Sequence, residues 1–334
     1  MKRKNLVKLV SAYMSCLILT TPLYSSASAV EPNSKKGDIK NTVLKVGGAI
    51  AGVVGITTLV GVLYNKLSNN NNNSESNNTN TNACKPNSNS NTTLSTFEEN
   101  FLEFKGTNKP DGDFFNNPKN YTHILMSKIN SLKKHVMVVE KSVVDENFLR
   151  DIGSNGDTVV VNAANRWGTG GGGVCGVIFK AMGLDWTVTE VENWKRRTGK
   201  DEIGTGNVFI HPSYELGKNV KSVKYVMQTV GPDFRECNVH EGYEKLYEAY
   251  YNTIILAAFK GVKNVVMPAI SMGIFLGNAS GEECSIIALT AIADALETLE
   301  QEHLQTNFMV YLCDFKSDTE TSNFFKKCEI LLKS

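Results

Sequence analysis

Several patterns that would assign a function directly are absent from this sequence. Its five histidines form no close pair and its seven cysteines include no Cys-x-x-Cys pair, so the ligand spacing of a zinc site is missing. No Ser-His-Asp nucleophile motif occurs, and no glycine loop ends in the Lys-Ser or Lys-Thr of a P-loop. We therefore expect no metal, no cofactor and no covalent catalysis, and a protein that acts by positioning its ligand.

A large net charge is also absent from the whole chain, but its two parts differ. The formal net charge of the 334 residues is +1 at pH 7. Residues 1–66 contain nine Lys or Arg against two acidic residues, whereas the remainder contains 26 basic and 32 acidic residues. An acidic remainder lacks the basic surface of a non-specific nucleic-acid binder. We expect no nucleic-acid partner and a small ligand that is held locally.

Residues 1–29 have the pattern of a signal peptide. Lys2-Arg3-Lys4 precede an apolar stretch over residues 9–21, and Ala27-Ser-Ala29 offers small residues to a signal peptidase. A cleaved signal peptide is the prediction, and an uncleaved anchor is the alternative.

A second apolar run lies within the basic segment 30–68. Residues 46–64 carry no charge over 19 positions, which is about the length that spans a hydrocarbon core as a helix. A transmembrane helix is the prediction, and a membrane-surface or otherwise buried segment is the alternative. We expect the protein to be secreted or anchored to a membrane through this N-terminal segment, on a side that the sequence does not define.

Low-complexity sequence separates this segment from the rest. Residues 69–96 consist mainly of Asn, Ser and Thr with almost nothing apolar to bury, which predicts a disordered linker. Residues 97–133 are mixed and are interrupted by Pro110 and Pro118, so they form an extension whose structure the sequence does not define. The main domain is expected over residues 134–334.

Strand-like and helix-like stretches alternate within the main domain. This alternation favours an α/β fold, a three-layer α/β/α sandwich with a mixed, largely parallel sheet. Apolar and tyrosine side chains recur at helical spacing over residues 243–258 and 286–296, and both stripes are predicted to face the core. The predicted strands are 136–139, 158–161, 207–210, 225–230, 264–267 and 308–312.

The most informative stretch runs from Val159 to Gly176. Three valines suit a buried strand, Asn162 and Asn165 follow, and a glycine-rich turn opens into a helix that begins near Val174. Consecutive glycines let backbone N–H groups approach an oxyanion, and a helix N-terminus adds positive potential. The stretch therefore predicts a cradle for a diphosphate.

Two other interpretations stay open from these residues alone. Gly168-x-Gly170-x-x-Gly173 formally fits a dinucleotide fingerprint, but a polar Asn-Arg-Trp insert separates it from the strand. The acidic residues Glu190 and Glu192 are also only loosely placed to bind a ribose. A flexible turn without a ligand is the other interpretation, although two asparagines beside six glycines are hard to explain by packing.

Four segments in the right order make the chain resemble the macrodomain family, over roughly residue 134 to the end. In their detailed residue pattern, the motifs look most similar to those of MacroD-like and viral members. In order, the segments are similar to the family's first ligand loop, an internal strand with a Val-Gly-Pro corner, the second ligand loop and the late strand beside the adenine. They are Asn162-Ala-Ala-Asn165 with the glycines to Gly176, Gln228-Thr-Val-Gly-Pro232, Met267-Pro-Ala-Ile-Ser271-Met-Gly-Ile-Phe275-Leu-Gly277, and Val310-Tyr-Leu-Cys-Asp314.

The resemblance implies a monomeric domain that binds ADP-ribose or an ADP-ribosylated protein. Asn162 would chiefly support the first loop, and Asn165 would be the catalytic residue, binding the distal ribose and orienting a water. Two donor-rich loops would clamp the diphosphate, because burying it without hydrogen bonds is very costly. The implied loop residues are Gly171, Gly172, Gly173 and Val174, and Ser271, Met272, Gly273, Ile274 and Phe275, whose ring would pack on the distal ribose.

The adenine end and one substitution distinguish this chain from its relatives. Asp145 is the candidate acceptor for the adenine amine, and Cys313 stands where viral relatives have an aromatic residue, with Phe315 close by. Many MacroD-like hydrolases carry an acidic residue where this chain has Cys175. The resemblance thus leaves two functions open. Asn165 favours a hydrolase that removes mono-ADP-ribose from Asp or Glu or deacetylates O-acetyl-ADP-ribose, and Cys175 favours a non-catalytic reader.

Overall fold

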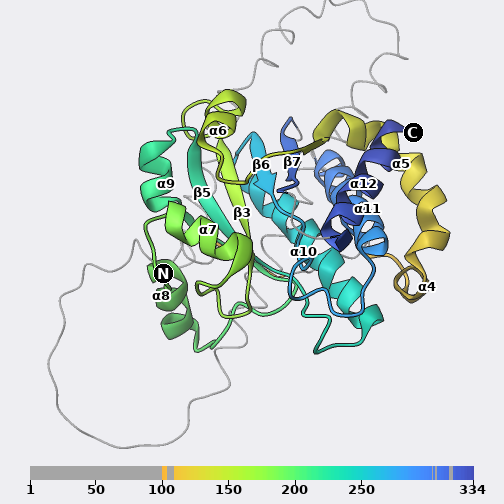
Figure 1. Cartoon of the computed structure of the whole chain (residues 1–334), viewed down its shortest axis with the longest axis horizontal. Helices are drawn as coiled ribbons and strands as arrows, with labels where there is room; N and C mark the ends of the chain where they lie inside the picture. The colour runs from red at the N-terminus through yellow and green to blue at the C-terminus, as the bar shows by residue number, and fades with distance from the viewer. Residues whose placement is uncertain (1–99, 104–108, 303, 305–306, 316–318) are drawn as a thin grey trace, which may run out of the picture. The chain divides into compact units, whose positions relative to one another are not determined.

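The computed structural model describes residues 100–103, 109–302, 304, 307–315 and 319–334 (Figure 1). The expected signal peptide, the apolar run 46–64 and the linker 69–96 lie outside these residues. Among the helices of the described ranges, none is both long and apolar enough to cross a membrane.

In the described part of the chain, seven strands form one sheet in the order β1-β4-β5-β3-β6-β7-β2. The strands are β1 (Phe101–Leu102), β2 (Val136–Val139), β3 (Thr158–Ala164), β4 (Val208–Pro212), β5 (Val223–Val230), β6 (Asn264–Met267) and β7 (Met309–Cys313). Neighbours from β5 to β2 run parallel, whereas β4 is antiparallel to both β5 and β1. The expected mixed, largely parallel sheet is confirmed.

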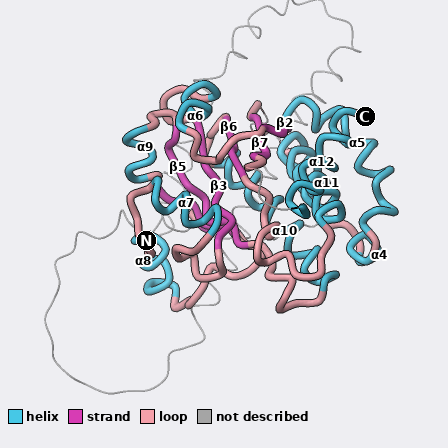
Figure 2. Tube along the Cα trace, in the orientation of Figure 1, coloured by secondary structure: helices cyan, strands magenta, loops and turns pink. Residues whose placement is uncertain are grey.

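Helices cover both faces of this sheet, so the strands lie between two groups of helices (Figure 2). One group comprises α6 (Glu146–Ile152), α7 (Gly173–Ala181), α8 (Thr189–Thr198) and α9 (Tyr214–Asn219); the other comprises α5 (Thr122–His135), α10 (Val239–Phe259), α11 (Gly281–Gln301) and α12 (Thr319–Lys333). Val159 and Val161 of β3 join the core under the second group, whereas Val160 joins the core under the first. Because successive strand side chains point to opposite faces, a run of valines buries both sides of the sheet.

The predicted elements match the structure closely in the centre of the sheet. Two predicted strands coincide with β2 and β6, and the other four differ by one to three residues. β3 is longer than predicted, because it pairs with β5 as far as Ala164 opposite Val230, so Asn162 is a strand residue. The side-chain stripes over 243–258 and 286–296 are buried in α10 and α11, as expected. The short edge strand β1 was not predicted.

The extension 97–133 is folded where the structure describes it. β1 pairs with β4, and α4 (Gly112–Asn116), the 3-10 helix η2 (Pro118–Tyr121) and α5 lead into β2. Phe115 of α4 packs edge-on against Tyr247 of α10, with 5.8 Å between the ring centroids. α5 continues to His135, past the expected domain start at residue 134. The extension and the domain therefore share a helix.

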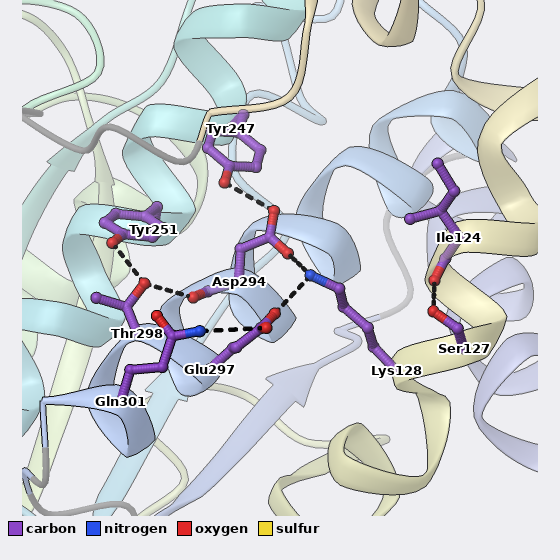
Figure 3. Close-up of polar contacts among 9 residues, drawn as sticks. All are labelled: Ile124, Ser127, Lys128, Tyr247, Tyr251, Asp294, Glu297, Thr298 and Gln301. Atoms are coloured by element: carbon purple, nitrogen blue, oxygen red, sulfur yellow. Dashed lines mark hydrogen bonds and ion pairs between the residues drawn. The ribbon is translucent and has the colours of Figure 1, made fainter.

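A polar cluster around the largely buried Asp294 fastens α5 to α11 (Figure 3). Lys128 Nζ of α5 donates to Asp294 Oδ1 at 2.6 Å and to Glu297 Oε2 at 2.7 Å. Tyr247 of α10 donates its hydroxyl to the other carboxylate oxygen of Asp294 at 2.8 Å. Burial raises the pKa of Asp294, and the Lys128 ammonium opposes that rise. The cluster joins three helices, one of them from the extension.

Candidate functional site

The predicted site segments meet at one edge of the sheet. β3, β6, β7 and β2 are consecutive neighbours and run parallel, so their carboxyl ends lie at the same edge. The first loop (residues 165–172) follows β3, and the second loop (residues 268–280) follows β6. Phe315 follows β7, and Asp145 follows β2. In open α/β sheets, ligands bind in the crevice outside the carboxyl ends of the strands.

The first loop is folded around the Asn165 side chain. Asn165 Oδ1 accepts from the backbone N–H groups of Trp167 at 3.1 Å and Thr169 at 3.2 Å, and Asn165 Nδ2 donates to the Thr169 carbonyl at 3.0 Å. A short polar side chain thus replaces part of the secondary-structure hydrogen bonding that a loop lacks. The role of Asn165 toward a ribose and a water stays a prediction.

The glycines of the first loop and of the start of α7 divide into packed and open positions. A Cβ at Gly170 would lie 2.7 Å from the Asp185 carbonyl oxygen, and a Cβ at Gly176 would lie 2.6 Å from the Gly171 carbonyl oxygen. At Gly172 and Gly173, by contrast, a Cβ would meet nothing within 4 Å. The first two glycines therefore allow close backbone packing, and the last two leave the entrance to α7 open.

The N-terminus of α7 lies at this open position. Gly172 is the N-cap residue and supplies no side chain to cap the helix, and Gly173 begins the helix with a φ of +58°. The N–H groups of the first turn have no partner further back in the helix, and they carry the positive end of its dipole. This geometry suits the binding of an anion such as a phosphate.

The second loop is held by side chains from outside it. Tyr250 of α10 accepts from the Ile270 N–H at 2.9 Å, and Thr321 of α12 donates to the Met272 carbonyl at 2.9 Å. Ser271 has a φ of +63° and donates its hydroxyl to the Pro232 carbonyl at 2.7 Å. The tip differs: Gly273 has open space around it, and the side chain of Ile274 is 76% exposed.

The other end of the edge brings Asp145 and Cys313 together. Asp145 is the N-cap of α6 and accepts from the Phe148 N–H at 3.0 Å. Burial raises the pKa of the Cys313 thiol to about 12, and the nearby negative charge of Asp145 adds to the rise. Phe315 is 72% exposed, beside the carboxyl end of β7. The predicted adenine-end residues thus lie at one part of the edge. Phe275, which was predicted to pack on the distal ribose, has the Arg235 guanidinium 5.3 Å from its ring centroid.

Buried polar side chains continue from the first loop into the sheet. Asn162 of β3 is fully buried, and its Nδ2 donates to Gln228 Oε1 of β5 at 2.7 Å and to Cys175 Sγ of α7 at 3.4 Å. Gln228 Nε2 lies 2.8 Å from Nε2 of the buried His211 of β4. Burial lowers the pKa of His211 to about 4, so this imidazole is neutral near pH 7.

Cys175 occupies the position where the resemblance implies an acid in many hydrolases. Its side chain is buried, and burial raises the pKa of the thiol. The thiol is therefore protonated near neutral pH and provides neither a carboxylate nor a thiolate. Among the described residues, no group of three or more His, Cys, Asp or Glu side chains is arranged to hold a metal ion.

Sequence reasoning missed the residues that hold the two loops. Gln228 and Tyr250 lie in segments that were predicted as a strand and a core stripe, and Thr321 and His211 were assigned no role. A polar residue inside a buried strand was the available signal for Gln228, because buried amides are nearly always hydrogen-bonded. The hydroxyl of Tyr250 gave no signal in the helical spacing.

Comparison with known proteins places the site in a described family. The profile of the family described as Macro domain matches residues 161–281. An uncharacterised protein of Fusobacterium nucleatum is 33% identical over 168 residues, which cover 50% of this chain and 86% of that protein. An ADP-ribose glycohydrolase of Archaeoglobus fulgidus is 35% identical over 119 residues, covering 35% of this chain and 61% of that protein. Among solved structures, an Oceanobacillus iheyensis macrodomain with ADP aligns with a TM-score of 0.45 at 23% identity, over 60% of this chain and 93% of that one.

Proposed function

The chain belongs to the macro domain family, and from this premise we propose that it binds ADP-ribose and hydrolyses mono-ADP-ribose from acidic side chains or deacetylates O-acetyl-ADP-ribose. The observation that carries the proposal is the convergence of the two predicted ligand loops with the predicted adenine-end residues Asp145 and Cys313, at the carboxyl ends of β3, β6, β2 and β7. At the β3 end of that edge lies the N-terminus of α7, which has no side-chain cap and begins with two glycines, Gly172 and Gly173, around which there is open space.

The ligand would lie along this edge with its diphosphate between the two loops. The N–H groups of the first turn of α7 would bind one side of the diphosphate, and the backbone of residues 271–275 would cover the other. The adenine would lie near Asp145 and Cys313, which are close to each other. The distal ribose would lie near Asn165 and Phe275, at the opposite end of the ligand.

The hydrolysis would rely on positioning. A water held beside the anomeric carbon forms the new C–O bond, the bond to the carboxylate of the modified side chain breaks, and the water's proton passes to the released carboxylate. The protonated Cys175 thiol cannot accept that proton. A phosphate of the substrate itself and Asn165 would therefore orient the water.

A second function, a reader that binds ADP-ribosylated protein without cleaving it, is favoured by two observations. Cys175 is buried and supplies no acid at the position where many hydrolytic relatives have one. The Asn165 amide uses both its oxygen and its nitrogen in hydrogen bonds within its own loop.

Release of ADP-ribose from a Glu-modified protein separates the two functions. The full-length protein should release it with Asn165 intact, and Asn165→Ala should slow the release by about 100-fold or more, the scale for losing a positioning group. Asn165→Asp is the matched variant, because it keeps the acceptor for the Trp167 and Thr169 N–H groups and loses the donor. If the wild type and both variants release ADP-ribose no faster than buffer, the hydrolase proposal is wrong and the non-catalytic reader is the remaining function.

Binding is tested separately by calorimetry. ADP-ribose should bind in the micromolar range, about −8 kcal/mol, and NAD should bind more weakly because its nicotinamide collides with the distal-ribose pocket. No heat with ADP-ribose, or tighter binding of NAD, would refute both proposed functions.

A further inference from the structure

We propose that His211 and Gln228 are positioning residues for the ADP-ribose site, because they set the orientation of a continuous hydrogen-bond relay that ends on the first loop. The relay consists of His211, Gln228, Asn162 and Cys175, and it ends at the Thr169 carbonyl. This inference rests on the proposed function. It adds two residues that lie on β4 and β5, beneath the site and outside both ligand loops.

The polarity of the relay is fixed at its far end. His211 Nδ1 lies 2.8 Å from the Pro212 carbonyl oxygen, which can only accept, so Nδ1 carries the proton. The imidazole is neutral near pH 7, so Nε2 has a lone pair and accepts. Gln228 must therefore present its NH₂ group to His211 Nε2 across 2.8 Å, and its carbonyl oxygen points the other way.

The same logic orients Asn162. Because Gln228 presents Oε1, Asn162 must donate to it from Nδ2, which lies 2.7 Å away. The second Nδ2 proton is directed at Cys175 Sγ, 3.4 Å away. Reversing either amide would set oxygen against oxygen, or nitrogen against nitrogen, at one of these contacts. The Pro212 carbonyl on β4 thus determines which end of the Asn162 amide faces α7.

The last link reaches the predicted catalytic residue. Cys175 Sγ accepts from Asn162, so the thiol is free to donate to the Thr169 carbonyl, 3.6 Å away. The Thr169 carbonyl also accepts from Asn165 Nδ2 at 3.0 Å. Asn165 and the first turn of α7 are therefore fastened to the sheet through one chain of contacts. In this protein, Cys175 is a hydrogen-bond link between strand and loop.

The relay is buried, so we expect its loss to change the conformation or mobility of the first loop. His211, Asn162 and Gln228 are 1%, 0% and 0% exposed, and water cannot replace a missing partner easily at such sites. Within the described residues, the buried Asn162 Oδ1 has no hydrogen-bond partner, so the orientation of this amide depends on the bonds that Nδ2 donates. Removing the acceptor at residue 211 leaves the amides of Gln228 and Asn162 free to reverse.

The test compares five variants of the full-length protein. His211→Leu removes the acceptor, whereas His211→Gln supplies a carbonyl oxygen at similar reach. Thr229→Val is the matched control: Thr229 is the next residue of β5, equally buried, and it bonds Thr253 at 2.9 Å on the opposite face of the sheet. Cys175→Ala and Cys175→Ser repeat the comparison at the last link, so the test survives if His211→Leu fails to fold.

The readouts are affinity for ADP-ribose and for AMP, and hydrogen exchange of the two loops without ligand. His211→Leu should weaken ADP-ribose binding about tenfold, the scale of one buried hydrogen bond with an orphaned partner, and change AMP binding by less than about twofold. It should raise exchange in residues 165–172 and leave residues 268–280 unchanged. His211→Gln should recover most of the affinity, and Thr229→Val should leave it unaltered.

Three results would overturn the relay: unchanged affinity and exchange in His211→Leu, equal losses in the leucine and glutamine variants, or an equal loss in Thr229→Val. If the wild-type protein binds no ADP-ribose, the proposed function fails. The exchange of residues 165–172 in His211→Leu then still decides whether the relay orders the first loop.

Discussion

The first loop and the second loop border the same edge of the sheet, but they are held in opposite ways. The first is organised from within by the Asn165 amide and from beneath by Cys175 of α7, which is itself hydrogen-bonded to Asn162 of β3. The second is clamped from outside, by a hydroxyl of α10 at Ile270 and a hydroxyl of α12 at Met272. Because half of the residues in the first loop are glycines, its shape depends on hydrogen bonds to the backbone.

This difference implies that one loop is rigid and that part of the other can adjust its conformation. The first loop ends in the N-terminus of α7, where donors must point at one place in order to bind a phosphate. The second loop is fixed at residues 270–272, while its tip at Gly273 and Ile274 makes few contacts. We infer that the first loop supplies a pre-formed cradle and that the tip of the second adapts to the ligand.

The largest expected effect attacks the cradle directly. Gly172→Glu should weaken ADP-ribose binding by about 100-fold or more, because it places a like charge beside the diphosphate. The fold should persist, since a Cβ at Gly172 meets nothing within 4 Å and its φ of −84° suits any residue. Calorimetry and thermal unfolding measure the two properties. Gly112→Glu is the control, because Gly112 also has open space around it. An equal loss of affinity in that variant would contradict the prediction that Gly172 borders the diphosphate.

Acidic pH should lower the free energy of unfolding through His211, which lies beneath the first loop. The pKa of His211 is lowered from 6.5 to about 4, so the unfolded chain binds more protons between these values. The stability from the neutral imidazole is complete above pH 6.5 and is lost as the pH falls to about 4, a change of about 3 kcal/mol.

Urea unfolding at pH 7 and pH 4.5 measures this loss. His211→Gln has no imidazole, so its free energy of unfolding should fall less over the same interval than that of the wild type. Equal falls in the two proteins would show that His211 does not stay neutral in the folded state.

Loss of the clamp on the second loop should have a smaller effect. Tyr250→Phe removes the acceptor of the Ile270 N–H, which should lower the free energy of unfolding by about 1–3 kcal/mol and weaken ADP-ribose binding several-fold. Tyr251→Phe is the control, since that hydroxyl bonds Thr298 of α11, outside both loops. If both variants lose affinity equally, the clamp does not act on the site.

The smallest expected effect lies at the tip. Ile274→Ser should change the free energy of unfolding by less than about 0.5 kcal/mol, because the side chain is 76% exposed. Affinity for ADP-ribose should fall only a few-fold, through lost packing on the ligand. A loss as large as that of Gly172→Glu would mean that the tip is as pre-formed as the cradle.

The sheet and the location of the site were predictable, because both depend on local sequence. Runs of valine predicted β2, β3 and β6, and the glycines predicted the turn before α7, since these residue types set backbone conformation wherever they occur. The Asn165 hydrogen bonds join residues two and four positions apart, within reach of a sequence argument.

The supports of the loops were not predictable, because they join residues far apart in the chain. Asn162 and Gln228 meet only through the register of β3 on β5, and Tyr250 meets Ile270 only through the packing of α10 against the sheet. β1 is two residues long and is defined by its pairing with β4 rather than by any periodicity. The relation of Asp145 to Cys313 likewise depends on β2 lying beside β7.

The contacts of α5 have a consequence for where this protein can be shortened. Leu125, Ile129 and Leu132 are buried in the core under α10 and α11, and Lys128 is the ion-pair partner of the largely buried Asp294. Truncation at residue 134, where the family resemblance begins, would expose that core to solvent. It would also leave the Asp294 carboxylate without its counter-ion, Lys128. The smallest stable fragment of this chain is therefore longer than the family segment. The extension and the family segment fold as one unit.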